Sequence, residues 1–318
     1  MKLIITANGL QEKGLEPIKG LAARYFNIVV ANPWGRRGTK EEIKAVWDGA
    51  DAIICGAESF DREMIEAAPA SLKVLSHYGV GVDSIDIPAA KKRGIAVCNT
   101  PSANSTSVAE MAMGLMLSLA KQIPLHDEHT RLGEWKRFPS FELDGKTIGI
   151  VGFGAIGQAL AKRAHAFGMN IIAYDPDFHD EIAQKFCVQR VELNSLLETS
   201  DIVSLHAPCI EDTYRMINKN SLALMKKSAL LINVARGDLI DEDALYHALK
   251  NKLIAGAGLD VYSREPAREN MLFELENIVF TPHCSANTTE ACLKMGLMAV
   301  ENAYRVLLNL PGAHVCER

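Results

Sequence analysis

The sequence predicts an α/β protein made of two doubly wound domains with parallel sheets. Short apolar runs alternate with polar or amphipathic segments along most of the 318 residues, and this is the pattern of parallel strands joined by covering helices. The chain is longer than one compact core usually supports, so we expect two domains. A glycine-rich turn between two apolar runs near the middle of the chain also predicts a strand–turn–helix–strand unit there.

The first part of the chain, residues 1–99, carries five apolar runs that we assign to strands: 3–7, 28–31, 52–55, 73–76 and 96–99. The segments between them that we assign to helices are 16–25, 40–47, 61–67 and 88–93. In open sheets of this kind, ligands bind beyond the carboxyl ends of the strands. The loops that follow these runs are therefore candidate sites.

One of these loops, residues 76–83, has glycines at alternate positions. Gly79 and Gly81 directly follow the fourth apolar run, which leaves backbone N–H groups open to an anion such as a carboxylate. A plain turn explains the two glycines equally well, and the local sequence does not separate the two interpretations.

The segment 102–122 predicts a helix that is apolar on nearly every side, with a Ser/Asn-rich start that can cap it. Such a helix must be buried all round, so we expect it to link the two domains and to meet a second subunit. The next segment, 124–141, is polar and aromatic and predicts an arm or a long loop. We therefore expect a two-fold homodimer formed through the second domain.

The stretch from Lys146 to Pro176 predicts a dinucleotide-binding unit. An apolar run leads into Gly152, a helical pattern follows, and a second run ends at Asp175. Gly152 allows a tight turn, while the start of the helix offers N–H groups and a positive dipole end to phosphates. Gly154 lets the backbone approach a pyrophosphate, and Gly157 lets the helix pack close to the strand. The alternative is a unit in which the glycines serve only packing. The combination of flanking strands, helix and acid disfavours that alternative.

Asp175 lies 18 residues after Gly157, where a carboxylate can accept hydrogen bonds from both hydroxyls of the adenosine ribose. No Arg or Lys adjoins Asp175, and an unpaired carboxylate repels a 2′-phosphate. The sequence therefore favours NAD over NADP.

The remaining elements complete a second domain of ordinary size. We assign strands to 201–206, 229–234, 255–261 and 277–280, and helices to 191–197, 241–251 and 288–308, the last returning to the first domain.

Hydride transfer at an alcohol carbon needs an acid/base and a cation near the oxygen and the carboxylate. His206 and His283 both follow a short apolar strand, so spacing gives His283 only a slight preference. Arg236 follows a wholly apolar strand and suits bidentate capture of a carboxylate. The alternative is an Arg that caps a helix and pairs with Asp238 or Asp241.

Composition excludes several classes of protein. The net charge of −5 and the lack of a long basic cluster argue against a nucleic-acid surface. We expect no secretory signal, and the longest apolar stretch, 111–120, is about half of a membrane span. Seven scattered cysteines without a CxxC pair predict reduced thiols, and no metal-binding motif occurs. We expect a cytoplasmic protein without metal and without membrane association.

Several ordered motifs together resemble the D-isomer-specific 2-hydroxyacid dehydrogenase family, within it the phosphoglycerate dehydrogenase-like branch. In the second domain they are VGFGAIG with Asp175, NVARGDLID, GLDVYSREP and TPH, and in the first domain HYGVGVDSIDIPAA and NTPSANSTSVAE. The resemblance implies a Rossmann NAD-binding domain, 100–287, inserted into a flavodoxin-like substrate domain made of 1–99 and the returning helix in 288–318. It also implies NAD-dependent interconversion of a small 2-hydroxy acid and its 2-keto acid.

The resemblance further implies roles for individual residues. Arg236 binds the substrate carboxylate and polarises the carbonyl, His283 is the general acid/base, and Glu265 holds the imidazole and stabilises its protonated form. Asp260 hydrogen-bonds the nicotinamide carboxamide, and His206 lines the cofactor cleft. The other implied cofactor contacts are Gly152, Gly154, Ala155, Ile156, Gly157, Asp175, Pro208, Val234 and Ala235. The implied substrate contacts are Tyr78, Gly79, Val80, Gly81 and Asn104, with the carboxylate received by the backbone of residues 80 and 81.

The chain departs from the family pattern in the loop that follows TPH. The family usually has one residue and then glycine there, and this chain has Cys284 and Ser285. We expect the serine to narrow or shift the loop that carries His283.

A second departure concerns substrate charge. Phosphoglycerate-specific members tend to carry arginines after the third and fourth strands, where this chain has Cys55-Gly56-Ala57-Glu58 and His77-Tyr78. A neutral loop with a glutamate is a poor phosphate site. The sequence therefore favours an unphosphorylated acid such as hydroxypyruvate or glyoxylate over the alternative, 3-phosphoglycerate. We expect no C-terminal regulatory module, because the chain ends ten residues after Leu308.

An interpretation of another class is an NAD-sensing binding protein of the corepressor type on the same fold. Arg236, Glu265 and His283 do not exclude it, since catalysis would then be incidental. The lack of an evident peptide-docking segment or disordered tail argues against it.

Overall fold

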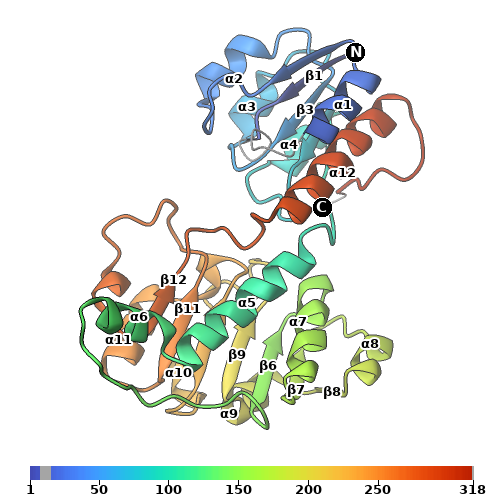
Figure 1. Cartoon of the computed structure of the whole chain (residues 1–318). Helices are drawn as coiled ribbons and strands as arrows, with labels where there is room; N and C mark the ends of the chain where they lie inside the picture. Colours follow the sequence, from blue (N-terminus) through green and yellow to red (C-terminus); the bar gives the residue numbers. More distant parts are fainter. Residues whose placement is uncertain (8–15, 317–318) are drawn as a thin grey trace. The chain divides into compact units, whose positions relative to one another are not determined.

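The computed structural model describes residues 1–7 and 16–316, which form two compact units (Figure 1). Unit 1 comprises Met1–Asn104 and Asn287–Arg318, and unit 2 comprises Ser105–Ala286. The sequence analysis placed the divisions after residues 99 and 287. Residues 100–104 lie instead with unit 1, where the Thr100 N–H donates a hydrogen bond of 2.9 Å to the Gly79 carbonyl.

Unit 1 is built on a five-stranded parallel sheet in the order β2-β1-β3-β4-β5. Its strands are β1 (Lys2–Ile5), β2 (Ile28–Ala31), β3 (Ala52–Cys55), β4 (Val74–His77) and β5 (Ala96–Cys98). Its helices are α1 (Glu16–Tyr25), α2 (Lys40–Val46), α3 (Arg62–Glu66), α4 (Ile87–Lys92) and α12 (Thr289–Leu307). Apolar residues of α2, α3 and α4 pack on one face of the sheet, and those of α1 and α12 on the other. This is the flavodoxin-like strand order, which reverses between β1 and β3.

Unit 2 is built on a seven-stranded parallel sheet in the order β12-β11-β10-β9-β6-β7-β8. Its strands are β6 (Thr147–Val151), β7 (Asn170–Tyr174), β8 (Val188–Arg190), β9 (Ile202–Leu205), β10 (Leu230–Asn233), β11 (Gly256–Leu259) and β12 (Ile278–Phe280). Its helices are α5 (Ser105–Ala120), α6 (Ile123–Arg131), α7 (Ala155–Ala166), α8 (Asp180–Lys185), α9 (Leu193–Thr199), α10 (Lys219–Leu224) and α11 (Glu242–Lys250), with two 3₁₀ turns, η2 (Gly237–Leu239) and η3 (Met271–Glu274).

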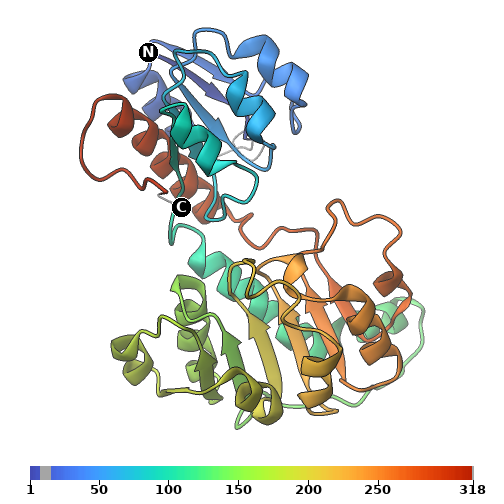
Figure 2. The same cartoon turned by 180° about the vertical axis from the view of Figure 1, so that it is seen from behind.

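The strand order of unit 2 reverses between β6 and β9, which places a topological switch point at the carboxyl ends of these two strands. One apolar layer includes residues of α5 and α7, and the other includes residues of α9, α10 and α11. Figures 1 and 2 show these helices on opposite faces of the sheet. The prediction of two doubly wound parallel-sheet domains is confirmed.

Cap residues set where several helices begin. Thr39 and Glu42 form a capping box at α2, in which each side chain bonds the other residue's backbone. Asp241 caps α11 and Thr288 caps α12. A cap of this kind contributes about 1 kcal/mol to helix stability, so these polar residues fix the register of the apolar faces that follow.

Helix α5 obtains most of its burial inside unit 2, where it packs on α7, β10 and β11. Its exposed side includes Glu110, whose carboxylate lies 2.7 Å from the Arg163 guanidinium on α7. The expectation that α5 also meets a second subunit stays a prediction.

The prediction of an arm or loop over 124–141 is wrong for its first part, because α6 begins at Ile123. Pro124 stands in the first turn of α6, where a missing N–H costs nothing and the fixed φ favours a helix. Residues 134–141 form no regular element. Among the described helices, none has both the length and the apolar character needed to cross a membrane.

Candidate active site

The glycine turn of unit 2 lies between β6 and α7, at the carboxyl edge of the sheet. Gly152 has φ +93°, and a Cβ there would lie 2.6 Å from the backbone of residues 206 and 207, so only glycine fits. A Cβ on Gly157 would lie 2.2 Å from the Gly152 carbonyl oxygen, whereas one on Gly154 would meet no described atom within 4 Å. The first and last glycines therefore permit close packing, while Gly154 faces open space.

That open space adjoins the amino end of α7, a helix of 12 residues. Ala155 and Ile156 are its first two residues, and N–H groups at these positions have no carbonyl of their own helix to bind. Together with the helix dipole they suit an anion such as a pyrophosphate. The turn thus fits the phosphates of a dinucleotide.

Asp175 follows β7 and lies against the same turn. One of its carboxylate oxygens accepts the Phe153 N–H at 2.5 Å, and the other accepts the Asp177 N–H at 2.8 Å. Because a carboxylate can accept about four hydrogen bonds, capacity remains for two hydroxyl donors. The position and capacity of Asp175 fit a ribose with free 2′ and 3′ hydroxyls.

The loops after β9 and β10 lie at the same carboxyl edge as the glycine turn. They carry four of the five remaining residues assigned to the cofactor from the sequence: His206, Pro208, Val234 and Ala235. Val234 is buried, Ala235 is half-buried with its N–H bound to the Asn233 side chain at 3.0 Å, and Pro208 is exposed. Their direct contact with a cofactor stays a prediction.

His206 is not suited to acid/base chemistry near neutral pH. Its Nε2 lies 2.8 Å from the Ser204 hydroxyl, and its Nδ1 is buried without a hydrogen-bond partner among the described residues. Burial lowers the pKa of His206 to about 3, since an apolar surrounding disfavours the charged ring. His206 is therefore neutral at pH 7.

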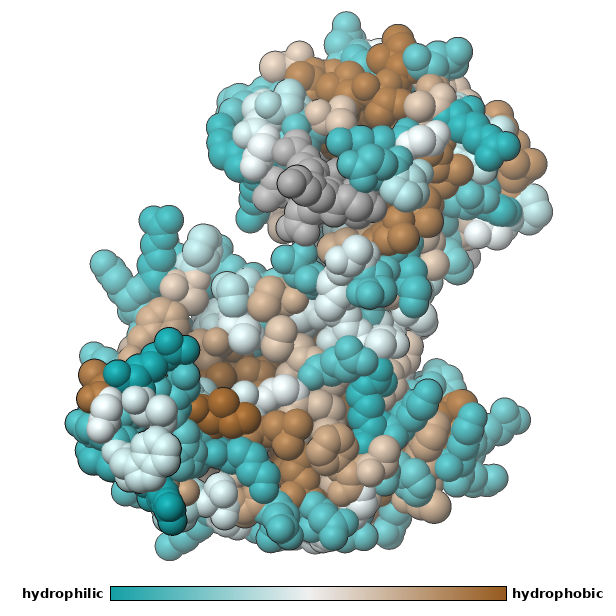
Figure 3. Space-filling view, viewed as in Figure 1, coloured by the Kyte–Doolittle hydropathy of each residue, from teal (hydrophilic) through white to brown (hydrophobic). Residues whose placement is uncertain are grey.

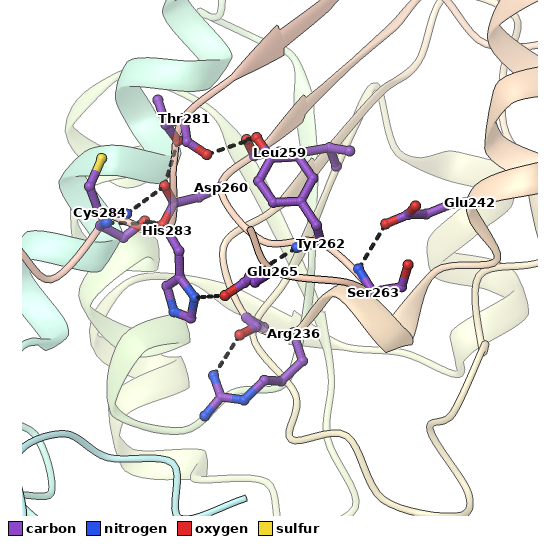
Figure 4. Close-up of polar contacts among 12 residues, drawn as sticks. Arg236, Glu242, Leu259, Asp260, Tyr262, Ser263, Glu265, Thr281, His283 and Cys284 are labelled. Carbon is purple, nitrogen blue, oxygen red and sulfur yellow. Dashed lines mark hydrogen bonds and ion pairs between the residues drawn. The ribbon is translucent and has the colours of Figure 1, made fainter. Parts of the chain in front are cut away.

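His283 instead faces a carboxylate, as the close-up in Figure 4 shows. Its Nδ1 lies 2.7 Å from the Glu265 Oε2, while the Glu265 Oε1 accepts the Tyr262 N–H at 3.1 Å. The His283 side chain is 51% exposed and that of Glu265 is 36% exposed. The pair thus has one ring nitrogen fixed by a carboxylate and the other, Nε2, available for a substrate.

The charges of this pair stabilise each other. The hydrogen bond that the His283 ring donates to the Glu265 carboxylate raises the pKa of His283 against the opposing effects of burial and of Arg236. Burial acts to raise the pKa of Glu265, but the hydrogen bond and charge of His283 hold it below its ordinary value. This is the electrostatic state expected of a histidine that donates and accepts a proton near neutral pH.

Arg236 lies just after β10, and Figure 4 shows its side chain on the same side as Glu265 and His283. Its guanidinium donates to the Ala235 carbonyl at 2.6 Å, and its own carbonyl accepts the Asn233 side-chain amide at 2.8 Å. Asp241, one of the alternative partners considered for Arg236, caps α11 and lies 3.7 Å from Arg215. The Arg236 guanidinium thus places a positive charge near the His283–Glu265 pair.

Asp260 follows β11 and is completely buried. Its carboxylate accepts hydrogen bonds from the loop that carries His283, including one from the Thr281 hydroxyl at 2.5 Å (Figure 4). Burial and this carboxylate raise the pKa of the neighbouring Cys284 thiol, so the thiol stays protonated. Contact between Asp260 and a nicotinamide carboxamide stays a prediction.

The residues assigned to the substrate lie in unit 1. Gly79 has φ +155°, and its carbonyl accepts both the N–H and the hydroxyl of Thr100, at 2.9 and 3.0 Å. The Val80 carbonyl accepts the Asn99 side-chain amide at 2.7 Å. Within the described residues, neither the Val80 nor the Gly81 N–H donates a hydrogen bond. These two N–H groups fit a carboxylate.

Tyr78 lies within this loop and Asn104 lies further along the chain, and the two residues differ in their surroundings. The Tyr78 hydroxyl donates to the Cys292 carbonyl at 3.2 Å, which ties the loop to α12. The side-chain oxygen of Asn104 is buried and has no partner among the described residues. Binding of substrate by these residues stays a prediction.

Two side chains that hold the His283 loop, Ser107 and Thr281, were not identified from the sequence. Ser285 was noted only as a departure from the family pattern, without the inward direction of its hydroxyl. Thr281 belongs to the same TPH motif as His283, two residues before it, and this closeness to a candidate residue was the available signal. No group of three or more His, Cys, Asp or Glu side chains suited to a metal ion occurs in residues 1–7 and 16–316.

Comparison with known proteins agrees with this geometry. Residues 113–285 match the model of the D-isomer specific 2-hydroxyacid dehydrogenase family, NAD binding domain. This chain belongs to that family. The family resemblance found in the sequence is therefore confirmed, and unit 2 is its NAD-binding domain.

Relatives within this family carry several names. The chain is 46% identical over 273 residues to D-3-phosphoglycerate dehydrogenase of Methanocaldococcus jannaschii, covering 85% of this chain and 52% of that protein. It is 42% identical over 274 residues to hydroxypyruvate reductase of Thermotoga maritima, covering 84% and 88%. A solved glyoxylate reductase from Paecilomyes thermophila superposes with a TM-score of 0.87 at 30% identity, covering 99% and 97%. The chain thus spans about half the length of the phosphoglycerate dehydrogenase that it matches.

Proposed function

We propose that this protein is an NAD-dependent D-2-hydroxyacid dehydrogenase, which interconverts a small 2-keto acid and the D-2-hydroxy acid. The observation that carries the proposal is the His283–Glu265 pair at 2.7 Å, with Arg236 beside it (Figure 4). All three residues lie in unit 2, whose glycine turn fits a dinucleotide. Relatives named hydroxypyruvate reductase and glyoxylate reductase support the same class of reaction.

Each residue then has a defined step in the reduction. NADH, when bound, supplies the hydride to the carbonyl carbon. Arg236 binds the substrate carboxylate and draws electron density from the adjacent carbonyl. His283 donates the proton from Nε2 to the carbonyl oxygen, and Glu265 orients the ring and stabilises its charged form. In the oxidation, neutral His283 accepts the hydroxyl proton instead.

An NADH-oxidation screen over glyoxylate, hydroxypyruvate, pyruvate and longer 2-keto acids tests this proposal. We expect turnover with at least one small acid and formation of the D-hydroxy acid. NADH binding without turnover of any of these acids would favour an NAD-sensing binding protein of the corepressor type.

We also propose that the substrate is unphosphorylated, as in hydroxypyruvate or glyoxylate. Glu58, in the loop after β3, is 2% exposed and accepts the Gly56 N–H at 2.6 Å. A buried carboxylate at the ligand-binding edge of a sheet opposes a phosphate dianion. Arg62 points to Asp86 at 3.7 Å, and Arg131 is paired with Asp127 at 2.8 Å, so both cations already have acidic partners.

The ratio of kcat/KM for hydroxypyruvate and 3-phosphohydroxypyruvate tests this preference. We expect hydroxypyruvate to be favoured. A tenfold preference for the phosphorylated acid, about 1.4 kcal/mol in transition-state binding, would instead indicate a phosphate site and D-3-phosphoglycerate dehydrogenase activity.

We further propose a cytoplasmic homodimer formed through unit 2. Large apolar side chains are exposed on and after α6: Ile123 at 51%, Leu132 at 66% and Trp135 at 84%. Figure 3 shows hydrophobic residues gathered on the side of unit 2 where α5 and α6 lie, and exposed apolar patches of this kind favour association. No disulfide joins the cysteines in the part of the chain that the structure describes, which suits a reducing compartment. A monomer mass in light scattering at micromolar concentration would contradict the dimer.

A further inference from the structure

The loop 281–285, which carries His283, is wrapped around one buried carboxylate. Asp260 Oδ1 accepts the Thr281 hydroxyl at 2.5 Å and the Cys284 N–H at 2.9 Å. Its Oδ2 accepts the N–H and the hydroxyl of Ser285, at 2.9 and 2.5 Å. Because a carboxylate has about four acceptor positions, the loop fills them all. Asp260 is 0% exposed, so no acceptor position reaches the surface.

These bonds hold His283 in an unusual backbone conformation. His283 has φ +51°, in the left-handed region that costs a non-glycine residue about 1 kcal/mol or more. The His283 N–H donates to the backbone carbonyl of Asp260 at 2.8 Å. This is the fifth hydrogen bond between Asp260 and the loop. The ring is thereby directed at Glu265.

Ser285 is the member of this set that departs from the family pattern, in which glycine is usual. Its side chain is 4% exposed, and its φ is not positive, so the backbone does not require glycine. Its carbonyl accepts the Ser107 hydroxyl on α5 at 2.5 Å. With the serine in place, the loop is bonded to Asp260 and His283 is bonded to Glu265, and the serine adds one buried hydrogen bond to Asp260. The expected narrowing or shift of the loop stays a prediction.

We propose that Ser285 is a positioning residue, whose hydroxyl occupies the acceptor position on Asp260 that a glycine would leave open to the nicotinamide carboxamide. In this chain the four hydrogen bonds of the Asp260 carboxylate hold the His283 loop. The cofactor amide then binds without Asp260, in contrast to the contact that the family resemblance implies. The Ser285 hydroxyl thus lowers the affinity for the cofactor and holds the His283 ring in a fixed position. This inference rests on the proposed function only in assuming that a nicotinamide cofactor binds unit 2.

The test is Ser285→Ala, which removes the hydroxyl without adding volume. It frees one acceptor position on Asp260 and leaves the loop with one bond fewer. We expect the Kd of NADH, measured by fluorescence titration without substrate, to fall about three- to tenfold, as one net hydrogen bond implies. Hydrogen exchange of loop 281–285 in the cofactor-free protein should become faster, and kcat should fall. Tighter binding with slower turnover is not the result of a merely weakened structure.

Ser107→Ala is the matched control, because it loosens the same loop from α5 and leaves every Asp260 bond in place. We expect faster exchange of the loop and no tightening of NADH binding. Ser285→Gly should repeat the result of Ser285→Ala, and melting temperatures identify any variant that fails to fold. In the wild-type protein, the Cys284 and Ser285 amides should stay protected when NADH is added.

Unchanged or weaker NADH binding by Ser285→Ala overturns the inference. Tighter binding by Ser107→Ala, or loss of wild-type amide protection on adding NADH, overturns it as well. These readouts need no keto-acid substrate. A failed turnover screen with the predicted binding changes would therefore reject the proposed function and leave the role of Ser285 intact.

Discussion

The loops after β9 and β12 each carry a histidine just past a buried strand, yet the two rings are in opposite electrostatic states. Within residues 1–7 and 16–316 the His206 ring bonds only the Ser204 hydroxyl, and burial lowers the pKa of His206 to about 3. His283 is half exposed and its pKa is raised by the Glu265 carboxylate at 2.7 Å. A position at the ligand edge of the sheet therefore does not by itself prepare a histidine for acid/base chemistry near neutral pH, and the carboxylate partner is what raises the pKa of His283.

The largest expected difference between the two loops is in catalysis. His283→Gln removes the proton donor, so kcat for keto-acid reduction should fall by about 10²- to 10⁴-fold. The Kd of NADH should stay within about twofold of the wild-type value, since no cofactor role is assigned to this ring. Steady-state kinetics and fluorescence titration measure the two quantities.

The matched variant is His206→Gln, which changes the histidine that has no carboxylate. Its kcat should fall far less than that of His283→Gln, and any loss should accompany weaker NADH binding. If His206→Gln lost as much kcat as His283→Gln at unchanged NADH affinity, the assignment of the acid/base to His283 alone would be wrong.

A smaller effect is expected when the partner of His283 is changed. Glu265→Gln keeps an acceptor for the Tyr262 N–H but removes the charge that raises the His283 pKa. Because reduction requires protonated His283, activity is lost as pH rises through this pKa, and the variant should lose activity at lower pH than the wild type. Profiles of kcat/KM against pH measure the shift. An unmoved profile would show that the pair does not control the protonation of His283.

The strands and the glycine turn could be predicted because they depend on local patterns. Apolar runs, turn glycines and the spacing to Asp175 are properties of neighbouring residues, and they predicted both sheets. Three short elements, α8, β8 and α10, were not assigned, since segments of 3 to 6 residues carry too few positions for a clear period. α6 was missed because the polarity of its residues was weighted above the proline at its start.

The electrostatics of the site could not be predicted from the residues alone. Glu265 and His283 come from different loops, 18 residues apart, and only the pairing of β11 with β12 brings those loops together. For this reason spacing left His206 and His283 nearly equivalent, and the family resemblance decided between them. Ser285 was recognised as a departure, but whether its hydroxyl turns inward depends on the buried position of Asp260.

The smallest expected effect is on stability, where the two histidines should act with opposite signs. The pKa of His206 is about 3 in the folded protein and about 6.5 in an unfolded chain. Unfolding therefore takes up a proton between these values, and the native state loses up to about 1.4 kcal/mol per pH unit as pH falls from 6.5. His283 has a raised pKa, so its contribution is fully present below pH 6.5 and is lost as pH rises through the folded value. That contribution is smaller, because a ring 51% exposed is screened by solvent.

Urea unfolding of the wild type and His206→Gln from pH 7.5 to 4.5 should give a shallower loss of stability for the variant. Comparing the slopes of unfolding free energy against pH cancels the pH-independent cost of the substitution. Parallel curves would mean that the His206 ring binds a proton in the folded protein as readily as in the unfolded chain.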